Sequence, residues 1–272
     1  LDLKEKNSFI KSKLSDDIYK IKKIYSSMGF NFVEVDAKIE NFDDNRLNLI
    51  FFVEKGVQTK IKKINFIGDK KVKDRRLRDI IVSEEDKFWK ILSKNTNLSE
   101  TNINLDKSLL IKYYKSIGFY DVQVVSSNAE ISQTDQTTLT FNINAGNRYR
   151  ITKIITNVSP VFDKKMFVPL NNEYKKVIGK YYSPLHIKDL LDEVEILINN
   201  NDLQFVEHSV NEIIQDNSIE VKINIYEGEK TLVERINILG NQVTNESVVR
   251  AELLIDEGDP YSQLKLEKSI AK

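Results

Sequence analysis

The chain has 272 residues, and its 41 lysines and arginines balance 41 aspartates and glutamates, so no net field favours a nucleic acid or an anionic membrane as partner. It contains no cysteine, which excludes disulfides, thiolate metal sites and cysteine nucleophiles. Hydrophobic residues make up 40% of the sequence, enough for packed cores, but no apolar run approaches the roughly 18 residues of a membrane-spanning helix.

The first predicted elements are a helix and a hairpin. Five residues recur at steps of three and four, the spacing of one face of an α-helix: Leu14, Ile18, Ile21, Tyr25 and Met28. Residues 47–56, LNLIFFVEKG, then alternate apolar and polar side chains and end in glycine, as expected of a half-buried strand. The chain therefore begins with a helix that is followed by a β-hairpin.

The end of this helix and the strand after it occur again further along. IYSSMGFNFVEV (residues 24–35) and YYKSIGFYDVQVV (residues 113–125) align Gly29 with Gly118. We expect both glycines to turn the chain at positive φ. A third copy, NNDLQFVEHSV (residues 200–210), lacks the glycine, and we expect a looser turn there because Asn and Asp tolerate this geometry less well.

The other elements repeat in the same order. Strand-like runs ending in glycine recur at residues 138–146 and 219–228, and the strands predicted to open each unit lie at 61–69, 151–158 and 233–241. Amphipathic stretches at residues 73–82 and 245–255 predict a helix after the opening strand. Each unit therefore has the order β-α-α-β-β, which makes a small α+β domain with two helices on one face of a three-stranded sheet.

These repeats divide the chain into four units. Residues 1–58 hold the second helix and hairpin of unit A, residues 59–148 form unit B, residues 149–231 form unit C, and residues 232–272 begin unit D. GKYYSPLHI (residues 179–187) matches GDPYSQLKL (residues 258–266), which marks the second helix of unit D. The linkers are short and carry no Gly/Ser/Pro run, so we expect an extended, semi-rigid array.

No group of residues predicts a reaction. Ser183, His186 and Asp189 invite comparison with a catalytic triad, but Ser183 before Pro184 is better explained as the N-cap of a helix. A hydrolase around Ser183 and His186 is retained only as an alternative. No glycine-rich nucleotide motif or histidine metal spacing occurs, so we expect no enzymatic activity, no cofactor and no metal.

The predicted sheets offer a different kind of site. Each small sheet exposes unpaired N–H and C=O groups on its edge strands, and these groups can bind another extended chain by β-augmentation. In unit B the side chains of Val122, Val124 and Ser126 would adjust the fit. Proline at Val124 is expected to weaken such binding without unfolding the domain.

These units resemble POTRA (polypeptide-transport-associated) domains over the whole chain. The resemblance is carried by the motif Y-x-x-x-G-[FY] before the second strand, by Gly-[Asn/Asp] after the first, and by stretches such as INFIGDKKVKDRRLRDII and INILGNQVTNESVVRAELLIDEGDPYS. Unit C lacks the Y-x-x-x-G-[FY] motif. The resemblance implies tandem β-α-α-β-β domains, each with a mixed three-stranded sheet.

The number of units, and the insertion SEEDKFWKILSKNTNLSETN in unit B, resemble those of the outer-membrane protein assembly factors of the family. This resemblance implies that units A to D correspond to POTRA domains 2 to 5 of those proteins. The resemblance implies a periplasmic arm before an outer-membrane barrel that is absent from this chain. Its implied partners are unfolded outer-membrane polypeptides and assembly lipoproteins, with no nucleic acid. The substrate-receptor arm of a secretion or translocation transporter is the alternative.

The resemblance also implies which residues contact partners. In the family, contacts concentrate on the second strands and second helices of central units and around the first helix and following loop of the last unit. The residues at these positions are Asp121, Val122, Gln123, Val124, Val125, Phe32, Val33, Glu34, Val35, Ile103, Arg250 and Glu257.

Overall fold

The computed structural model describes the chain except for residues 5–7, 43–45, 89–92, 132–136, 202, 230, 241–243 and 272. The chain forms two compact units, Leu1–Arg148 and Tyr149–Lys272. Across the described residues, we find no helix with the length and apolar character needed to span a lipid bilayer.

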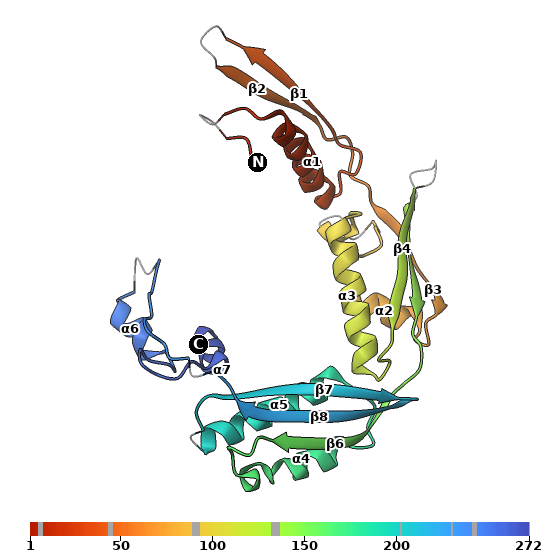
Figure 1. Cartoon of the computed structure of the whole chain (residues 1–272). Coiled ribbons are helices and arrows are strands. Elements are labelled where there is room, and N and C mark those ends of the chain that lie inside the picture. The colour runs from red at the N-terminus through yellow and green to blue at the C-terminus, as the bar shows by residue number, and fades with distance from the viewer. Residues whose placement is uncertain are drawn as a thin grey trace. The chain divides into compact units, whose positions relative to one another are not determined.

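The first unit begins with a helix and an antiparallel hairpin (Figure 1). The elements are α1 (Lys11–Ser27), β1 (Glu34–Asn41) and β2 (Leu47–Glu54). The register pairs Val35 with Val53 and Ala37 with Phe51. Four residues of the predicted apolar stripe are half-buried, but Met28 at the end of the helix is 53% exposed. The predicted helix and hairpin are therefore confirmed.

The rest of this unit forms a complete β-α-α-β-β domain. Its elements are β3 (Ile61–Asp69), α2 (Asp74–Ile80), the 3₁₀ turn η1 (Lys94–Thr96), α3 (Glu100–Ser116), β4 (Gln123–Ile131) and β5 (Thr137–Asn144). The sheet order is β3-β5-β4, with β3 parallel and β4 antiparallel to the central strand. The predicted mixed sheet is confirmed, and β3 and β4 are its two edges.

One core lies between this sheet and its helices. The central strand β5 buries alternate residues, among them Leu139 and Phe141, as a strand with one covered face does. Phe141 stacks on Phe66 of β3 with ring centroids 5.7 Å apart. Leu77 of α2 and Leu110 of α3 are fully buried in the same cluster, so both helices cover one face of the sheet.

The second unit repeats this domain (Figure 1). Its elements are β6 (Arg150–Val158), η2 (Lys164–Phe167), α4 (Leu170–Val177), α5 (Pro184–Asn200), β7 (Val206–Gln215) and β8 (Ser218–Glu227). The sheet order is β6-β8-β7. The parallel pair β6-β8 has its irregularity at Ile151/Lys153, in the place where β3-β5 has one at Ile61/Lys63. Two sheets with unlike sequences thus share even a local distortion.

The last residues contain α6 (Glu246–Ala251) and α7 (Gln263–Ile270). The strand predicted at residues 233–241 is wrong for the described part: residues 233–240 form no strand, and only Leu232 makes an isolated bridge, with Pro260. The pattern fails because a strand needs a hydrogen-bonding neighbour. No described strand lies beside this segment, whereas β3 and β6 each pair with a central strand.

The predicted glycine turns are confirmed. Gly29 has φ 93° and Gly118 has φ 102°, the region that a residue with a Cβ atom rarely adopts. In the third copy the aligned position, Asp202, lies outside the described residues, so the looser turn stays a prediction. The Leu203 N–H still donates to the Ile198 carbonyl at 3.1 Å, as the Phe119 N–H does to Tyr114 at 3.0 Å.

A backbone junction joins α1 and its hairpin to the complete domain that follows. The Thr59 N–H donates to the Gly29 carbonyl at 2.9 Å, and the Leu98 N–H donates to the Thr59 carbonyl at 2.7 Å. The Asn31 side chain donates to the Leu98 carbonyl at 2.9 Å. A Cβ at Gly29 would lie only 2.8 Å from the Cβ of Asn97, so this position requires glycine for space as well as for φ.

Candidate strand-edge sites

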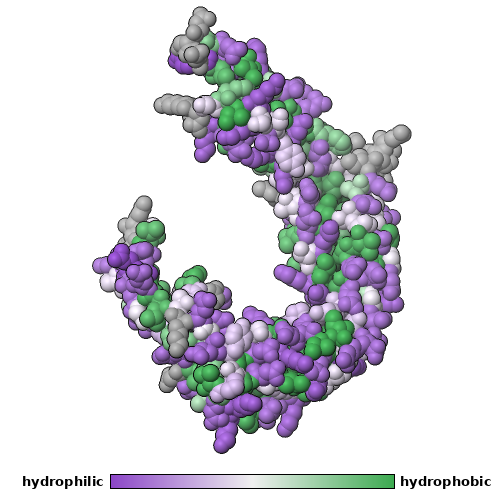
Figure 2. Space-filling model, in the orientation of Figure 1, coloured by the Kyte–Doolittle hydropathy of each residue, from purple (hydrophilic) through white to green (hydrophobic). Residues whose placement is uncertain are grey.

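The backbone groups at the sheet edges are the main candidates for binding. In the two complete sheets the edge strands are β3 and β4, and β6 and β7. On the face drawn in Figure 2, apolar residues form separate patches among larger hydrophilic areas. An edge strand can accept an added strand only where its outward N–H and C=O groups are free of other partners.

Side chains close the outer edge of β3. The Glu85 carboxylate accepts the Ile64 N–H at 3.1 Å, and the Arg78 guanidinium donates to the Ile64 carbonyl at 2.9 Å. Next to them, the Asp86 N–H donates to the Ile61 carbonyl at 2.6 Å. We call Arg78 and Glu85 the edge clamp, because together they occupy the positions that a neighbouring strand would use.

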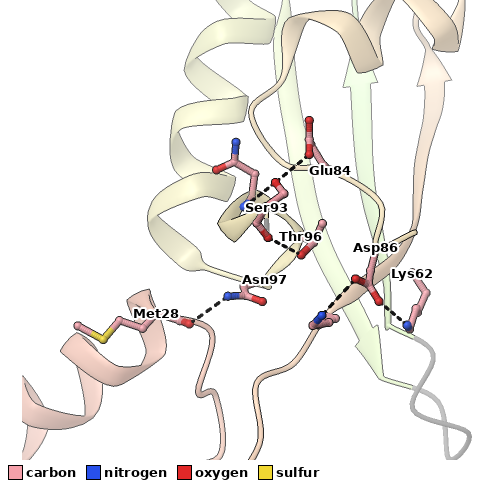
Figure 3. A network of polar contacts seen from close by, with 9 residues as sticks. Met28, Lys62, Glu84, Asp86, Ser93, Thr96 and Asn97 are labelled. Atoms are coloured by element: carbon pink, nitrogen blue, oxygen red, sulfur yellow. Dashed lines mark hydrogen bonds and ion pairs between the residues drawn. The ribbon is translucent and has the colours of Figure 1, made fainter. Parts of the chain in front are cut away.

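The loop that carries Glu85 of the clamp is itself held by polar contacts (Figure 3). Asp86 pairs with Lys62 at 2.6 Å and with Lys60 at 3.3 Å, and the hydrogen bond from Lys62 is the main cause that lowers the pKa of the Asp86 carboxyl. The Ser93 hydroxyl donates to Glu84 at 3.0 Å. The described part of this loop, residues 81–88 and 93–97, therefore covers the edge of β3.

The same clamp recurs near the end of the chain. The Glu257 carboxylate accepts the Ile236 N–H at 2.9 Å, Arg250 donates to the Ile236 carbonyl at 2.7 Å, and the two side chains lie 3.3 Å apart. The bond from the Ile236 N–H is the main cause that lowers the pKa of Glu257, and the hydrogen bond to Glu246 is the main cause that raises the pKa of Arg250. Two predicted partner residues, Arg250 and Glu257, thus lie together and bind the backbone of Ile236 within the chain.

Five predicted partner residues lie on β4, the opposite edge of the first complete sheet, or just before it. Asp121 and Val122 precede the strand. Val122 is buried and Val124 packs against the core, which leaves little of either side chain for a partner, and the expectation that they adjust the fit of a bound strand stays a prediction. Gln123 is exposed, and the irregularity between Val124 and Ser126 leaves Val125 outside the pairing register and 61% exposed.

In the first hairpin the predicted residues divide in the same way. Phe32 is 63% exposed, and Glu34 is exposed, whereas Val33 and Val35 are buried. Phe32 and Val33 lie before β1, which begins at Glu34. Ile103 on α3 is half-buried and packs against the core, which explains its apolar character without a partner.

Sequence reasoning missed a set of buried acceptors on the second helices. Asp106 of α3 is fully buried and accepts the N–H groups of Val82 at 2.6 Å and Ser83 at 3.2 Å. Asp17 of α1 accepts the N–H groups of two residues near the start of the chain at 2.7 and 2.9 Å, and the Ser269 hydroxyl of α7 accepts the Leu254 N–H at 2.8 Å. The signal in the sequence was an aspartate at the same repeat position in α1 and α3, beside the apolar stripe.

The triad-like residues form a helix start. The Ser183 side chain accepts the Leu185 N–H as the N-cap of α5, with Pro184 in the first turn, which confirms the cap. His208, the other histidine, lies 2.7 Å from Glu195. The described residues contain no cluster of three histidines, cysteines or acids that could hold a metal ion.

Comparison with known proteins identifies the fold family. Residues 1–56, 59–146 and 231–272 match the family model of POTRA, the surface antigen variable number repeat. The chain belongs to the POTRA family. The POTRA model does not match residues 147–230, although β6 to β8 and their helices repeat the order of the matched domain.

Curated relatives of this chain include two proteins named outer membrane protein assembly factor BamA. That of Neisseria meningitidis serogroup B is 23% identical over 275 residues, covering 98% of this chain and 34% of the relative. That of Neorickettsia risticii is 24% identical over 259 residues, covering 93% of this chain and 34% of the relative. The chain thus spans about a third of the length of these relatives.

A solved structure supports the POTRA fold independently. POTRA3-5 of Haemophilus influenzae BamA superposes with a TM-score of 0.59 at 15% sequence identity, covering 78% of this chain and 83% of that chain. At this identity the likeness concerns the fold alone. The fold class expected from the sequence, tandem α+β POTRA domains, is confirmed.

Proposed function

We propose that the chain is a periplasmic, non-enzymatic arm of the machinery that assembles outer-membrane proteins. In this role it binds extended segments of unfolded outer-membrane polypeptides by β-augmentation and docks assembly lipoproteins. The names of the curated relatives support the assembly role. The proposal includes the assignment of units A to D as POTRA domains 2 to 5.

One observation carries the proposal: in the part of the chain that the structure describes, side chains and a loop cover one edge of the β3-β5-β4 sheet but not the other. The clamp and its loop occupy the outward groups of β3 at Ile61 and Ile64. Among the described strands β4 pairs with β5 alone, and its exposed residues Gln123 and Val125 stand at the end nearest the Gly118 turn. Within the described residues no strand covers the outer side of β4, whereas the opposite edge, β3, is closed, and this difference supports strand addition at β4.

Backbone pairing suits this client class. Strands of outer-membrane proteins share an alternation of apolar and polar residues, with little common sequence. A receptor that uses main-chain hydrogen bonds tolerates such variety, because every residue except proline offers the same N–H and C=O groups. The predicted residues Phe32, Glu34, Gln123 and Val125 are exposed and remain available for contacts with clients or lipoproteins.

The test uses proline at the irregularity of β4. Val125→Pro is the better choice than proline at Val124, because bulges tolerate proline whereas the Val124 side chain packs on the core. A fluorescent peptide of about ten residues, the length of a transmembrane strand, should bind the wild-type chain and bind Val125→Pro about tenfold more weakly.

Val57→Pro is the matched control, since Val57 lies in a loop and is 82% exposed. It should leave peptide affinity unchanged. Circular dichroism and thermal unfolding establish that both variants are folded. A folded Val125→Pro chain with wild-type affinity would refute strand addition at this edge.

A further inference from the structure

The outer edge of β6 begins as the edge of β3 does. The Gly179 N–H donates to the Ile151 carbonyl at 2.7 Å, and the Ile151 N–H donates to the Lys180 carbonyl at 3.0 Å. Gly179 thus corresponds to Asp86, whose N–H binds the Ile61 carbonyl. In both sheets a loop that follows the first helix closes the first outward position of the opening strand.

The clamp that closes the next position is missing in this sheet. Arg78 and Glu85 precede Asp86 by the same numbers of residues as Arg250 and Glu257 precede Gly258. The positions at these distances before Gly179 hold Asn171 and Ile178. An amide and an isoleucine cannot reproduce the paired guanidinium and carboxylate that bind Ile64 and Ile236.

The groups left open can be named from the shared register. Ile64 pairs with Leu139 of the central strand and points its N–H and C=O at the clamp, away from β5. Ile154 has the same place opposite Val221, so its N–H and C=O point away from β8. Alternate residues of a parallel strand point their backbone groups in the same direction, so the N–H and C=O groups of Thr156 and Val158 also point away from β8. No hydrogen bond within the described residues uses the outward backbone groups of these positions.

A hollow of about 300 Å³ lies along this edge. Its walls include the consecutive residues Ile154, Ile155 and Thr156. Successive side chains of a strand point to opposite faces, so a hollow that touches all three must reach around the strand's edge. The other edge of β6 is filled by β8, which places the hollow on the outer side.

The far wall of the hollow has both apolar and polar residues, the latter including Asn171 and Tyr174, and one cation. Phe167 of η2 and Val168 after it supply apolar surface, and Val168 is 56% exposed. Lys164 also lines the hollow, and no acidic group among the described residues pairs with it. The site therefore complements an extended backbone, an apolar side chain and a negative charge.

We infer that β6 of unit C binds an extended client segment, in addition to β4 of unit B. The segment lies along Ile154 to Val158 as a fourth strand of this sheet, one of its apolar side chains enters the hollow beside Val168, and a neighbouring carboxylate contacts Lys164. The inference rests on the proposed β-augmentation of unfolded polypeptides and adds a second edge to it.

Photo-crosslinking to the whole chain tests the inference directly. The probe is a synthetic peptide of about ten residues that alternates valine and threonine and carries one glutamate and one benzoylphenylalanine, a length that matches a transmembrane strand. Mass spectrometry should find crosslinks at residues 154–158 and 164–171. Crosslinks only at residues 123–131 would overturn the inference and leave the proposed function intact, and crosslinks at neither edge would overturn both.

Exchanging the clamp gives matched variants. Asn171→Arg with Ile178→Glu introduces the clamp beside β6 and should reduce crosslinking at residues 154–158 about tenfold, while crosslinking at β4 is unchanged. Arg78→Asn with Glu85→Ile removes the clamp from β3 and should create new crosslinks at residues 61–67. Peptide without glutamate should crosslink less at β6 and equally at β4, because only β6 has Lys164 beside it.

Discussion

The carboxylate of Asp106 is expected to hold the loop after α2 onto α3. In Asp106→Ala the N–H groups of Val82 and Ser83 lose their acceptor. A buried donor without an acceptor costs about 1–3 kcal/mol, and the Ser83 residue is only 3% exposed. Removing a fully buried carboxylate offsets part of this loss, so we expect a net destabilisation of about 2 kcal/mol.

Asp106→Asn distinguishes the contribution of the hydrogen-bond acceptor from that of the negative charge. Its carbonyl oxygen can still accept both N–H groups, so it should cost less than about 1 kcal/mol at neutral pH. Asn104→Ala, an exposed substitution on the same helix, is the control. Urea unfolding followed by hydrogen exchange in peptides that cover α3 and β5 measures the free energy of unfolding of this domain. Equal losses in Asp106→Ala and Asp106→Asn would refute the reasoning.

The pH dependence provides a second check on Asp106. Burial raises the pKa of its carboxyl above the ordinary value of 3.8, against the lowering effect of Ser83 and Val82. The folded chain then keeps a proton that the unfolded chain loses, so the stabilisation by this group is complete below about 3.8 and is lost as the pH rises through the raised folded value. Wild type should therefore lose stability relative to Asp106→Asn as the pH rises over this window.

Two further predictions concern the opening strands and the clamp. Gly68→Ala should destabilise the fold by more than about 3 kcal/mol, because a Cβ there would lie 2.4 Å from the Ile143 carbonyl oxygen. Gly240→Ala is the control: Gly240 has the same φ of 87°, but no described atom lies within 4 Å of its Cβ, so this substitution should cost about 1–2 kcal/mol. Similar losses of stability for the two variants in thermal unfolding would contradict this reasoning. The lowered pKa of Glu257 means that its stabilisation is present above the ordinary value of 4.5 and is lost as the pH falls through the folded value. Protection of the Ile236 amide from hydrogen exchange should accordingly fall at acid pH in wild type but stay constant in Glu257→Gln.

Elements with a strong local period could be predicted from the sequence. The apolar steps that end at Gly118 specify a helix and its stop, since packing on one face and a positive φ are local requirements. The segment at residues 233–240 has the same alternation as β3, yet it forms no strand. The alternation of apolar and polar residues indicates which face of a strand can be buried. Whether the strand forms depends on a neighbouring strand from elsewhere in the chain that can pair with it.

The edge clamp could not be recognised from charge patterns alone. Arg78 and Glu85 look like ordinary surface charges, and Arg250 and Glu257 were predicted as partner contacts. The informative signal was their repetition at a constant distance from the isoleucine they bind, Ile64 in one unit and Ile236 in the other. A single residue type at one position carries little information about backbone hydrogen bonds, because those depend on the fold around it.

The junction between the first hairpin and the next domain has a mechanical consequence. Bending there would strain the main-chain bonds at Thr59 and Leu98 together with the Asn31 amide, within a space that admits no side chain at Gly29. Force applied to the hairpin is therefore transmitted as torque to the following domain. The junction resists bending between the hairpin and this domain, so hinge motion of the chain is expected at other positions.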